Sequence, residues 1–261
     1  EEDILYGNSG NDTFILRADN GIDVINGGAD FDTVDYSSLT SSQNLELTLN
    51  IASSTNATIK DGVTTYTDSI ENIENIKSGA GNDTLVGSDL NNTLFSQAGN
   101  DTLVGGKGND YLDGGDGIDT VDYSSISKVG DGSTNGITVN LEDQFTSTSA
   151  TVIINGGDND TLKNIENIIG TQNNDTITAS RSVNVLKGGF GNDLFIQTSA
   201  GIAGDIIDGG DDIDTIDYSA LGNGITVTLN GDNYSNAVSG STTHQIKNIE
   251  NVTGTTSSDF I

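Results

Sequence analysis

Residues 78–122 decide the fold, because they read as five consecutive nine-residue units: SGAGNDTLV, GSDLNNTLF, SQAGNDTLV, GGKGNDYLD and GGDGIDTVD. The units share an acidic or amide residue at the sixth position: Asp83, Asn92, Asp101, Asp110 and Asp119. They share an apolar residue at the eighth position: Leu85, Leu94, Leu103, Leu112 and Val121. Such a short fixed period predicts one small structural unit stacked many times.

Each unit, of the form GGxGxDxUx, divides into a six-residue loop and a three-residue strand. Glycine permits the positive φ angles that turn loop carbonyls inward, and the apolar eighth residue faces the core. Two units make one turn of eighteen residues, so equivalent loops stack about 4.8 Å apart. We therefore predict an all-β fold, a right-handed parallel β-roll or β-solenoid with stacked loops that bind calcium.

The composition is strongly acidic. The 261 residues include 34 Gly, no Pro, Cys, Met or Trp, and 39 acidic against 9 basic residues, a net charge of -30. Nucleic acids and anionic membranes are polyanions and are disfavoured as partners. The compact state of so acidic a chain is expected to need multivalent cations. The absence of Cys excludes disulfides and thiolate metal sites.

No run of residues has the length and composition of a signal peptide or a transmembrane span. The first and last residues fall inside repeat units, and GTTSSDFI at 254–261 copies the opening of another unit. We expect a piece of a longer solenoid, with its targeting signals elsewhere.

The nine-residue runs recur within a larger repeat of about 90 residues. The expected divisions are residues 1–77 (nonapeptide run 1–35), 78–168 (run 78–122), 169–253 (run 170–217), and the start of a further repeat at 254–261.

The inserts after the runs also resemble one another. Each begins with Asp-Tyr-Ser, at Tyr36, Tyr123 and Tyr218, and each ends with the sequence NIENI or NIENV. The apolar residues in between alternate with period two, which predicts a strand with one buried face. The spacing of three in Ile70, Ile73 and Ile76 fits a strand that turns a corner. We expect the tyrosines to cap or pack the wider turn.

Stacked loops bring carboxylates and carbonyl oxygens together, an all-oxygen shell that suits Ca²⁺ better than Zn²⁺ or Cu²⁺. The candidate ligands are the side chains of Asp12, Asp32, Asp83, Asp101, Asp110, Asp119, Asp175, Asp193, Asp205 and Asp214, and the backbone carbonyls of Gly99, Gly106, Gly108, Gly115, Gly117, Gly189 and Gly191. The spacing predicts the stacks Asp12 with Asp32, Asp83 with Asp101 and Asp119, Asn92 with Asp110, Asp175 with Asp193 and Asp214, and Asn184 with Asp205. Asn92 and Asn184 offer only neutral oxygens, so sites there are expected to be weak or empty.

These units resemble the RTX repeats, the hemolysin-type calcium-binding nonapeptides that form parallel β-rolls. In that family the nonapeptide repeat binds calcium. The inserts resemble segments between repeat runs in large RTX proteins of bacteria. The resemblance implies a protein exported by a type I system that folds in external calcium, at the cell surface or in the extracellular space.

Catalysis is not expected. The only histidine, His244, is predicted to be a surface residue, and it makes a Ser-His-Asp triad improbable. Glu71, Glu74, Glu166 and Glu250 recur at equivalent places, which favours a structural role over a pair of glycosidase carboxylates.

Two function classes remain. The first is a structural region of a surface or matrix protein, such as an S-layer, adhesin or fibre, with self-association or neighbouring repeats as partners. The second is the repeat region of a secreted enzyme or toxin whose catalytic domain lies outside this chain. Three repeats of about 90 residues with no catalytic constellation, and a repeat pattern that is open at both ends, favour the first.

Overall fold

The computed structural model describes residues 2–19, 21–50, 53–126, 135–142, 144, 149–154, 157–198 and 204–261. The described ranges are built on β-strands, as predicted. The chain divides into two compact units, residues 1–120 with 158–165, and residues 121–157 with 166–261. The predicted repeats of about 90 residues are divisions of the sequence, and they remain a prediction. No helix in the described ranges is long and apolar enough to cross a membrane.

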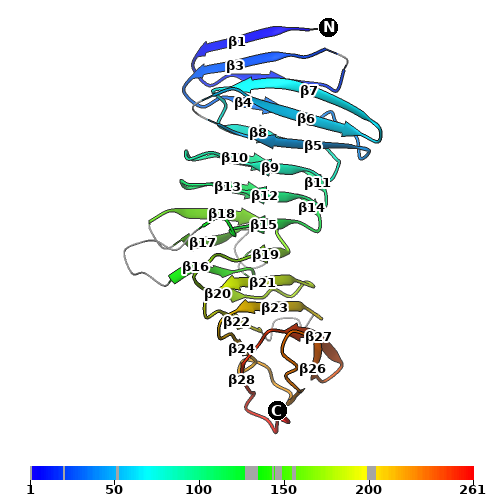
Figure 1. Cartoon of the computed structure of the whole chain (residues 1–261), viewed down its shortest axis with the longest axis vertical. Coiled ribbons are helices and arrows are strands. Elements are labelled where there is room, and N and C mark those ends of the chain that lie inside the picture. Colours follow the sequence, from blue (N-terminus) through cyan, green and yellow to red (C-terminus); the bar gives the residue numbers. More distant parts are fainter. Residues whose placement is uncertain are drawn as a thin grey trace. The chain divides into compact units, whose positions relative to one another are not determined.

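The first unit contains two main sheets (Figure 1). Its strands are β1 (Ile4–Ser9), β2 (Thr13–Ile15), β3 (Val24–Ala29), β4 (Thr33–Asp35), β5 (Gln43–Thr48), β6 (Thr55–Asp61), β7 (Thr64–Glu71), β8 (Asn75–Lys77), β9 (Thr84–Val86), β10 (Thr93–Phe95), β11 (Ala98–Gly99), β12 (Thr102–Val104), β13 (Tyr111–Asp113), β14 (Asp116–Gly117) and β18 (Asn159–Lys163). One sheet has the order β1-β3-β7-β6-β5-β9-β12, and the other has the order β2-β4-β8-β10-β13-β18. Strands β11 and β14 form a small separate pair.

The nonapeptide strands pair in parallel and in the register that the period predicts. Leu85 of β9 lies opposite Leu103 of β12, and Leu94 of β10 lies opposite Leu112 of β13. All four side chains are fully buried. Consecutive nonapeptide strands, β9, β10, β12 and β13, therefore alternate between the two sheets, and each apolar eighth residue stacks on its equivalent one turn away.

The insert of the first unit is a segment of three antiparallel strands within the parallel stack. Strands β5, β6 and β7 pair antiparallel, while β5 pairs in parallel with β9 and β7 with β3. The opposite sheet passes from β4 to β8 to β10 without interruption. The alternation of apolar residues correctly predicted a half-buried strand, with Leu45 and Leu47 facing inward, but it could not give the direction of the partner strand.

The corner predicted after β7 is present. Ile70, Ile73 and Ile76 are all buried, and between them Asn72 has a φ of 53°. Asparagine tolerates this left-handed conformation better than most residues. Tyr36 is also fully buried, so its packing role is confirmed.

The second unit repeats this plan. Its strands are β15 (Thr120–Asp122, of which Val121 and Asp122 belong to this unit), β16 (Asn135–Asn140), β17 (Ala150–Ile154), β19 (Asn167–Ile169), β20 (Asn174–Thr178), β21 (Val185–Phe190), β22 (Leu194–Ile196), β23 (Ile206–Asp211), β24 (Thr215–Asp217), β25 (Ile225–Val227), β26 (Ser235–Ser239), β27 (Thr242–Lys247) and β28 (Asn251–Thr253). The sheet orders are β15-β19-β21-β23-β27-β26-β25 and β17-β16-β20-β22-β24-β28. Strands β25, β26 and β27 pair antiparallel, as do β16 and β17.

His244 is a correction to the sequence prediction, because it is fully buried and not on the surface. Residues of β27 alternate between the two faces, and His244 and Ile246 both point into the core. Its Nδ1 accepts a hydrogen bond from the backbone N–H of Asp205 at 3.3 Å. A carboxylate, Asp68, performs the same task in the first unit, where it accepts the N–H of Asp23 at 3.2 Å. The period of two in β27 was the signal that could have placed His244 inside.

Candidate metal centre

The loop aspartates form ladders along each unit. In every predicted stack, Oδ1 of one aspartate accepts the backbone N–H of the equivalent residue one turn earlier. The N–H to Oδ1 distances are Asp12 to Asp32 2.8 Å, Asp83 to Asp101 2.7 Å, Asp101 to Asp119 2.8 Å, Asn92 to Asp110 2.8 Å, Asp175 to Asp193 2.8 Å, Asp193 to Asp214 2.8 Å and Asn184 to Asp205 2.9 Å. The stacking is as predicted, while the role of these residues as calcium ligands remains a prediction.

Burial makes the negative charge of these carboxylates costly. Asp12 is partly exposed, and the other nine candidate aspartates are buried. Loss of hydration raises the pKa of Asp110 to about 7 and that of Asp193 to about 9, with further contributions from neighbouring acids. It also raises the pKa of Asp214 to about 7, and those of Asp83 and Asp175 to about 6. A buried carboxylate that must ionise needs a positive charge beside it.

The second carboxylate oxygen has no partner in many of the loops. Buried Oδ2 atoms that lack any hydrogen bond belong to Asp12, Asp32, Asp101, Asp110, Asp193 and Asp214. Buried polar atoms in proteins almost always have a hydrogen-bond partner or an ion. These oxygens therefore identify positions where a cation would be stabilised.

The first residue of these loops is often a glycine, and the space that a Cβ would fill there is bordered by oxygens. A Cβ placed on Gly7 would lie 2.4 Å from both Asp12 Oδ2 and the carbonyl oxygen of Gly27, which is in the next turn. A Cβ on Gly188 would lie 2.0 Å from Asp193 Oδ2, and 2.4 Å from the carbonyl oxygen of the next turn. Oxygens from two successive turns thus converge where the side chain is missing. A hard cation with oxygen ligands, such as Ca²⁺, fits this arrangement.

The loops fall into two classes, which we call open and closed. In open loops the second residue has positive φ and the aspartate Oδ2 has no partner. The second residues of the open loops are Asn8 (71°), Gly28 (110°), Gln97 (71°), Gly106 (101°), Gly189 (107°) and Gly210 (107°).

In closed loops the second residue does not have positive φ, and its backbone N–H donates to the side chain four residues later. The pairs are Ser88 to Asn92 at 2.6 Å, Thr171 to Asp175 at 2.6 Å, Ser180 to Asn184 at 2.8 Å and Thr255 to Asp259 at 2.9 Å. The loop of Asp83 is also closed, because the Ser78 hydroxyl donates to Asp83 Oδ2. In a closed loop the protein itself satisfies the oxygen that a cation would use.

The side chains of the two loop asparagines, Asn92 and Asn184, also donate hydrogen bonds. Nδ2 of Asn92 donates to the Glu74 carbonyl at 2.7 Å, and Nδ2 of Asn184 donates to the Glu166 carbonyl at 2.6 Å. Both asparagine side chains are therefore hydrogen-bonded through the oxygen and through the nitrogen. This geometry favours the prediction that these loops hold calcium weakly or not at all.

The glycines named as carbonyl ligands all have left-handed backbone conformations. Their φ values are 133° for Gly99, 101° for Gly106, 102° for Gly108, 90° for Gly115, 147° for Gly117, 107° for Gly189 and 111° for Gly191. At Gly117 the need for glycine is also steric, since a Cβ would lie 1.7 Å from the Gly99 carbonyl oxygen. Sequence reasoning identified these loop positions, but it did not separate open from closed loops.

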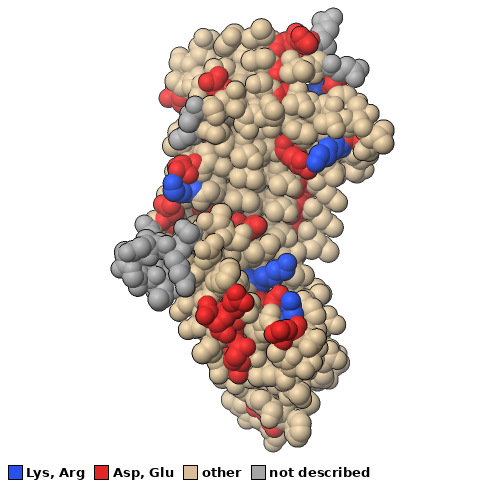
Figure 2. All heavy atoms as spheres, in the orientation of Figure 1, with Lys and Arg blue, Asp and Glu red and all other residues tan. Residues whose placement is uncertain are grey.

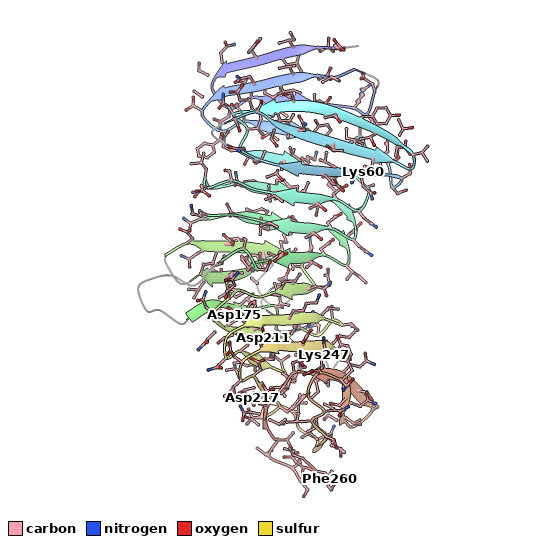
Figure 3. All side chains as sticks on the ribbon, viewed as in Figure 1. Lys60, Asp175, Asp211, Asp217, Lys247 and Phe260 are labelled. Carbon is pink, nitrogen blue, oxygen red and sulfur yellow. The ribbon has the colours of Figure 1, made fainter. Side chains whose placement is uncertain are left out.

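Basic side chains pair with acids outside the loop stacks. The ion pairs of Lys and Arg in the described ranges are Lys60–Glu46, Lys77–Asp35, Lys107–Asp89, Lys163–Asp113, Arg181–Glu142 and Lys247–Asp208. Figure 2 shows basic groups lying beside acidic ones on the visible surface. Figure 3 labels Lys247, whose Nζ lies 2.8 Å from Asp208 Oδ2. It also labels Asp175, which belongs to the closed loop that begins at Gly170. None of these six pairs involves one of the candidate loop aspartates.

The donor set excludes a site built from side chains alone. Among the residues that the structure describes, no three His, Cys, Asp or Glu side chains gather closely enough to hold a metal ion. A cation in an open loop would therefore be held by one or two carboxylates together with backbone carbonyls. Such a shell is typical of calcium and not of zinc.

The comparisons with known proteins agree with this chemistry. A family model for the RTX calcium-binding nonapeptide repeat matches residues 2–22, 17–35, 71–89, 86–121 and 165–196. No curated protein matches the chain. The matched segments contain both open and closed loops, and the strands between them form parallel sheets. The chain therefore contains RTX calcium-binding nonapeptide repeats, within an all-β fold of parallel sheets.

Proposed function

We propose that this chain is a calcium-stabilised structural repeat region of a secreted bacterial surface or extracellular-matrix protein, such as an S-layer, adhesin or fibre. Export by a type I system and folding on Ca²⁺ outside the cell follow from the RTX resemblance. The observation that carries the proposal is the set of buried, partnerless Oδ2 atoms in the open loops. They make the folded state dependent on a bound cation.

The ion has a structural task in this proposal. Each Ca²⁺ neutralises buried carboxylates and joins one turn to the next through shared oxygens. Because the sites form only when turns stack, the free energy of ion binding becomes free energy of folding. Extracellular calcium modules bind at roughly 10⁻⁴ to 10⁻³ M, a range that leaves the chain unfolded in the cytosol.

We propose no enzymatic role for this chain. The repeated glutamates have tasks in the backbone ladder: Glu74 accepts the N–H of Asp32 at 2.9 Å, and Glu250 accepts that of Asp214 at 2.8 Å. Neighbouring repeats of a longer chain, or a second copy, are the proposed partners. A catalytic motif in the flanking sequence would instead favour the repeat region of an enzyme or toxin.

Far-ultraviolet circular dichroism tests the proposal. We expect the β signal to be absent in EGTA, to appear on titration with Ca²⁺ in the millimolar range, and to be restored much less by Mg²⁺, which prefers to keep its water ligands. A sample that keeps its full β signal in EGTA would refute calcium-dependent folding.

A further inference from the structure

We propose that two Asn-Ile-Glu turns, Asn72–Glu74 and Asn248–Glu250, each supply half of a divalent-cation site that closes a run of nonapeptide loops. The other half of each site is the last open loop of the run. The proposal rests on the proposed calcium-dependent function, and it assigns sites to residues outside the nonapeptide pattern.

The first junction repeats the oxygen arrangement of an ordinary open loop. A Cβ on Gly27 would lie 2.4 Å from Asp32 Oδ2 and 2.1 Å from the carbonyl oxygen of Asn72. At Gly7, one turn earlier, the corresponding carbonyl belongs to a glycine of the next nonapeptide. The left-handed φ of 53° at Asn72 turns its carbonyl into the place of that glycine carbonyl. The turn therefore provides the same oxygen with a different sequence.

A glutamate replaces the next aspartate of the ladder. Asp12 donates its N–H to Oδ1 of Asp32, whereas Asp32 donates its N–H to Oε2 of Glu74 at 2.9 Å. Glu74 is only 7% exposed. Asn72 and Glu74 lie two residues apart, whereas Gly27 and Asp32 lie five apart. The extra methylene of glutamate lets the shorter turn present a carboxylate at the same level of the stack.

An unsatisfied oxygen points into this junction. Asp32 is fully buried, and its Oδ2 has no hydrogen-bond partner. Asp32 Oδ2 and the Asn72 carbonyl oxygen converge at Gly27, and the buried Glu74 carboxylate accepts the Asp32 N–H beside them. These groups form the all-oxygen environment that Ca²⁺ prefers.

The second unit shows the same junction independently. A Cβ on Gly209 would lie 2.4 Å from Asp214 Oδ2 and 1.9 Å from the Asn248 carbonyl oxygen. Asn248 has a φ of 50°, and Asp214 Oδ2 again has no partner. Glu250, which accepts the N–H of Asp214, is exposed at its position. Solvent screening should make this second site the weaker of the two.

Native mass spectrometry of the whole chain in calcium tests the proposal by counting bound ions. We would compare the wild type with Glu74→Gln, Glu250→Gln and the double variant. Glutamine keeps an oxygen that can accept the aspartate N–H, but it removes the charge. Each single variant should lose one ion or bind it at least about tenfold more weakly, and the double variant should lose two. Glu46→Gln is the matched control, because Glu46 is an exposed partner of Lys60 and its loss should leave the ion count unchanged.

The outcomes separate this proposal from the function on which it rests. A wild type that binds no Ca²⁺ would overturn the proposed function and these two sites with it. A wild type that binds Ca²⁺, with both glutamine variants keeping its ion count and affinity, would overturn the two junction sites alone. If Glu74→Gln fails to fold in calcium, Glu250→Gln decides the question, because an exposed position tolerates the change. If the two glutamates have only a structural role, the variants should have a lower thermal midpoint and an unchanged ion count.

Discussion

Acidification should partly replace calcium in folding this chain. Burial raises the pKa of Asp110 and Asp214 to about 7 and of Asp193 to about 9, from 3.8. In calcium-free solution, the contribution of each group to stability is therefore fully present below pH 3.8. It is lost as the pH rises through about 7 for the first two groups and about 9 for the third.

The size of this effect is comparable with the total stability of a domain. At pH 7 each of these three carboxyls lowers the free energy of unfolding by about 4 kcal/mol relative to its protonated state. Domains are usually stable by about 5–15 kcal/mol in total. At pH 5 the loss is only about 2 kcal/mol for each group. The calcium-free chain should thus be unfolded at neutral pH and recover β structure on acidification.

Circular dichroism in calcium-depleted buffer from pH 8.5 to 4.5 measures this effect. We expect the β signal to grow as the pH falls below about 7. A parallel series in about 0.5 M KCl screens long-range repulsion but leaves the desolvation of buried groups unchanged, so the pH dependence should persist. In Asp193→Asn, which cannot ionise, the β signal should appear at a higher pH than in the wild type, because the cost of ionising this buried group is removed. A β signal that is independent of pH, or that falls between pH 8.5 and 5, would refute the reasoning.

Two matched pairs of substitutions test the packing. Gly117→Ala should lower the free energy of unfolding in calcium by more than about 3 kcal/mol, because its Cβ would lie 1.7 Å from a backbone oxygen. Gly62 also has positive φ but has open space around it, so Gly62→Ala should lower the free energy of unfolding by only about 1 kcal/mol. Chemical denaturation measures both, and equal losses would contradict the steric argument. Tyr36→Phe should cost about 1–3 kcal/mol, since its hydroxyl donates to buried Asp68 at 2.8 Å. Tyr218→Phe should be nearly neutral, since its buried hydroxyl has no partner. A larger loss at Tyr218 than at Tyr36 would contradict this assignment.

The fold could be predicted from the nonapeptide period because period, register and burial are linked. A spacing of eighteen places Leu103 opposite Leu85, and both must face inward for the turns to stack. The inserts were harder to predict. Alternating apolar residues such as Leu45 and Leu47 bury one face of a strand equally well with a parallel or an antiparallel partner. The hairpin direction is set by turns whose sequences carry no such period.

The candidate site could be predicted only in part for a similar reason. The repeated aspartates predicted the stacks, but the loop class depends on the backbone at the second position. Serine or threonine there, as at Ser88 and Thr171, was the available signal, since closed loops use that residue to satisfy the Asx side chain. The role of Glu74 needed the structure, because it depends on a left-handed asparagine and a stacking partner 42 residues away.

A crystal structure in calcium, with anomalous difference maps recorded at a long wavelength, tests the central claim most directly. The claim is that Ca²⁺ occupies open loops and leaves closed loops empty. We predict calcium peaks beside Oδ2 of Asp32, Asp110, Asp193 and Asp214, and no peak in the loops of Asn92 and Asn184. Empty open loops in a folded, calcium-saturated crystal would contradict the account, as would calcium bound in the asparagine loops instead.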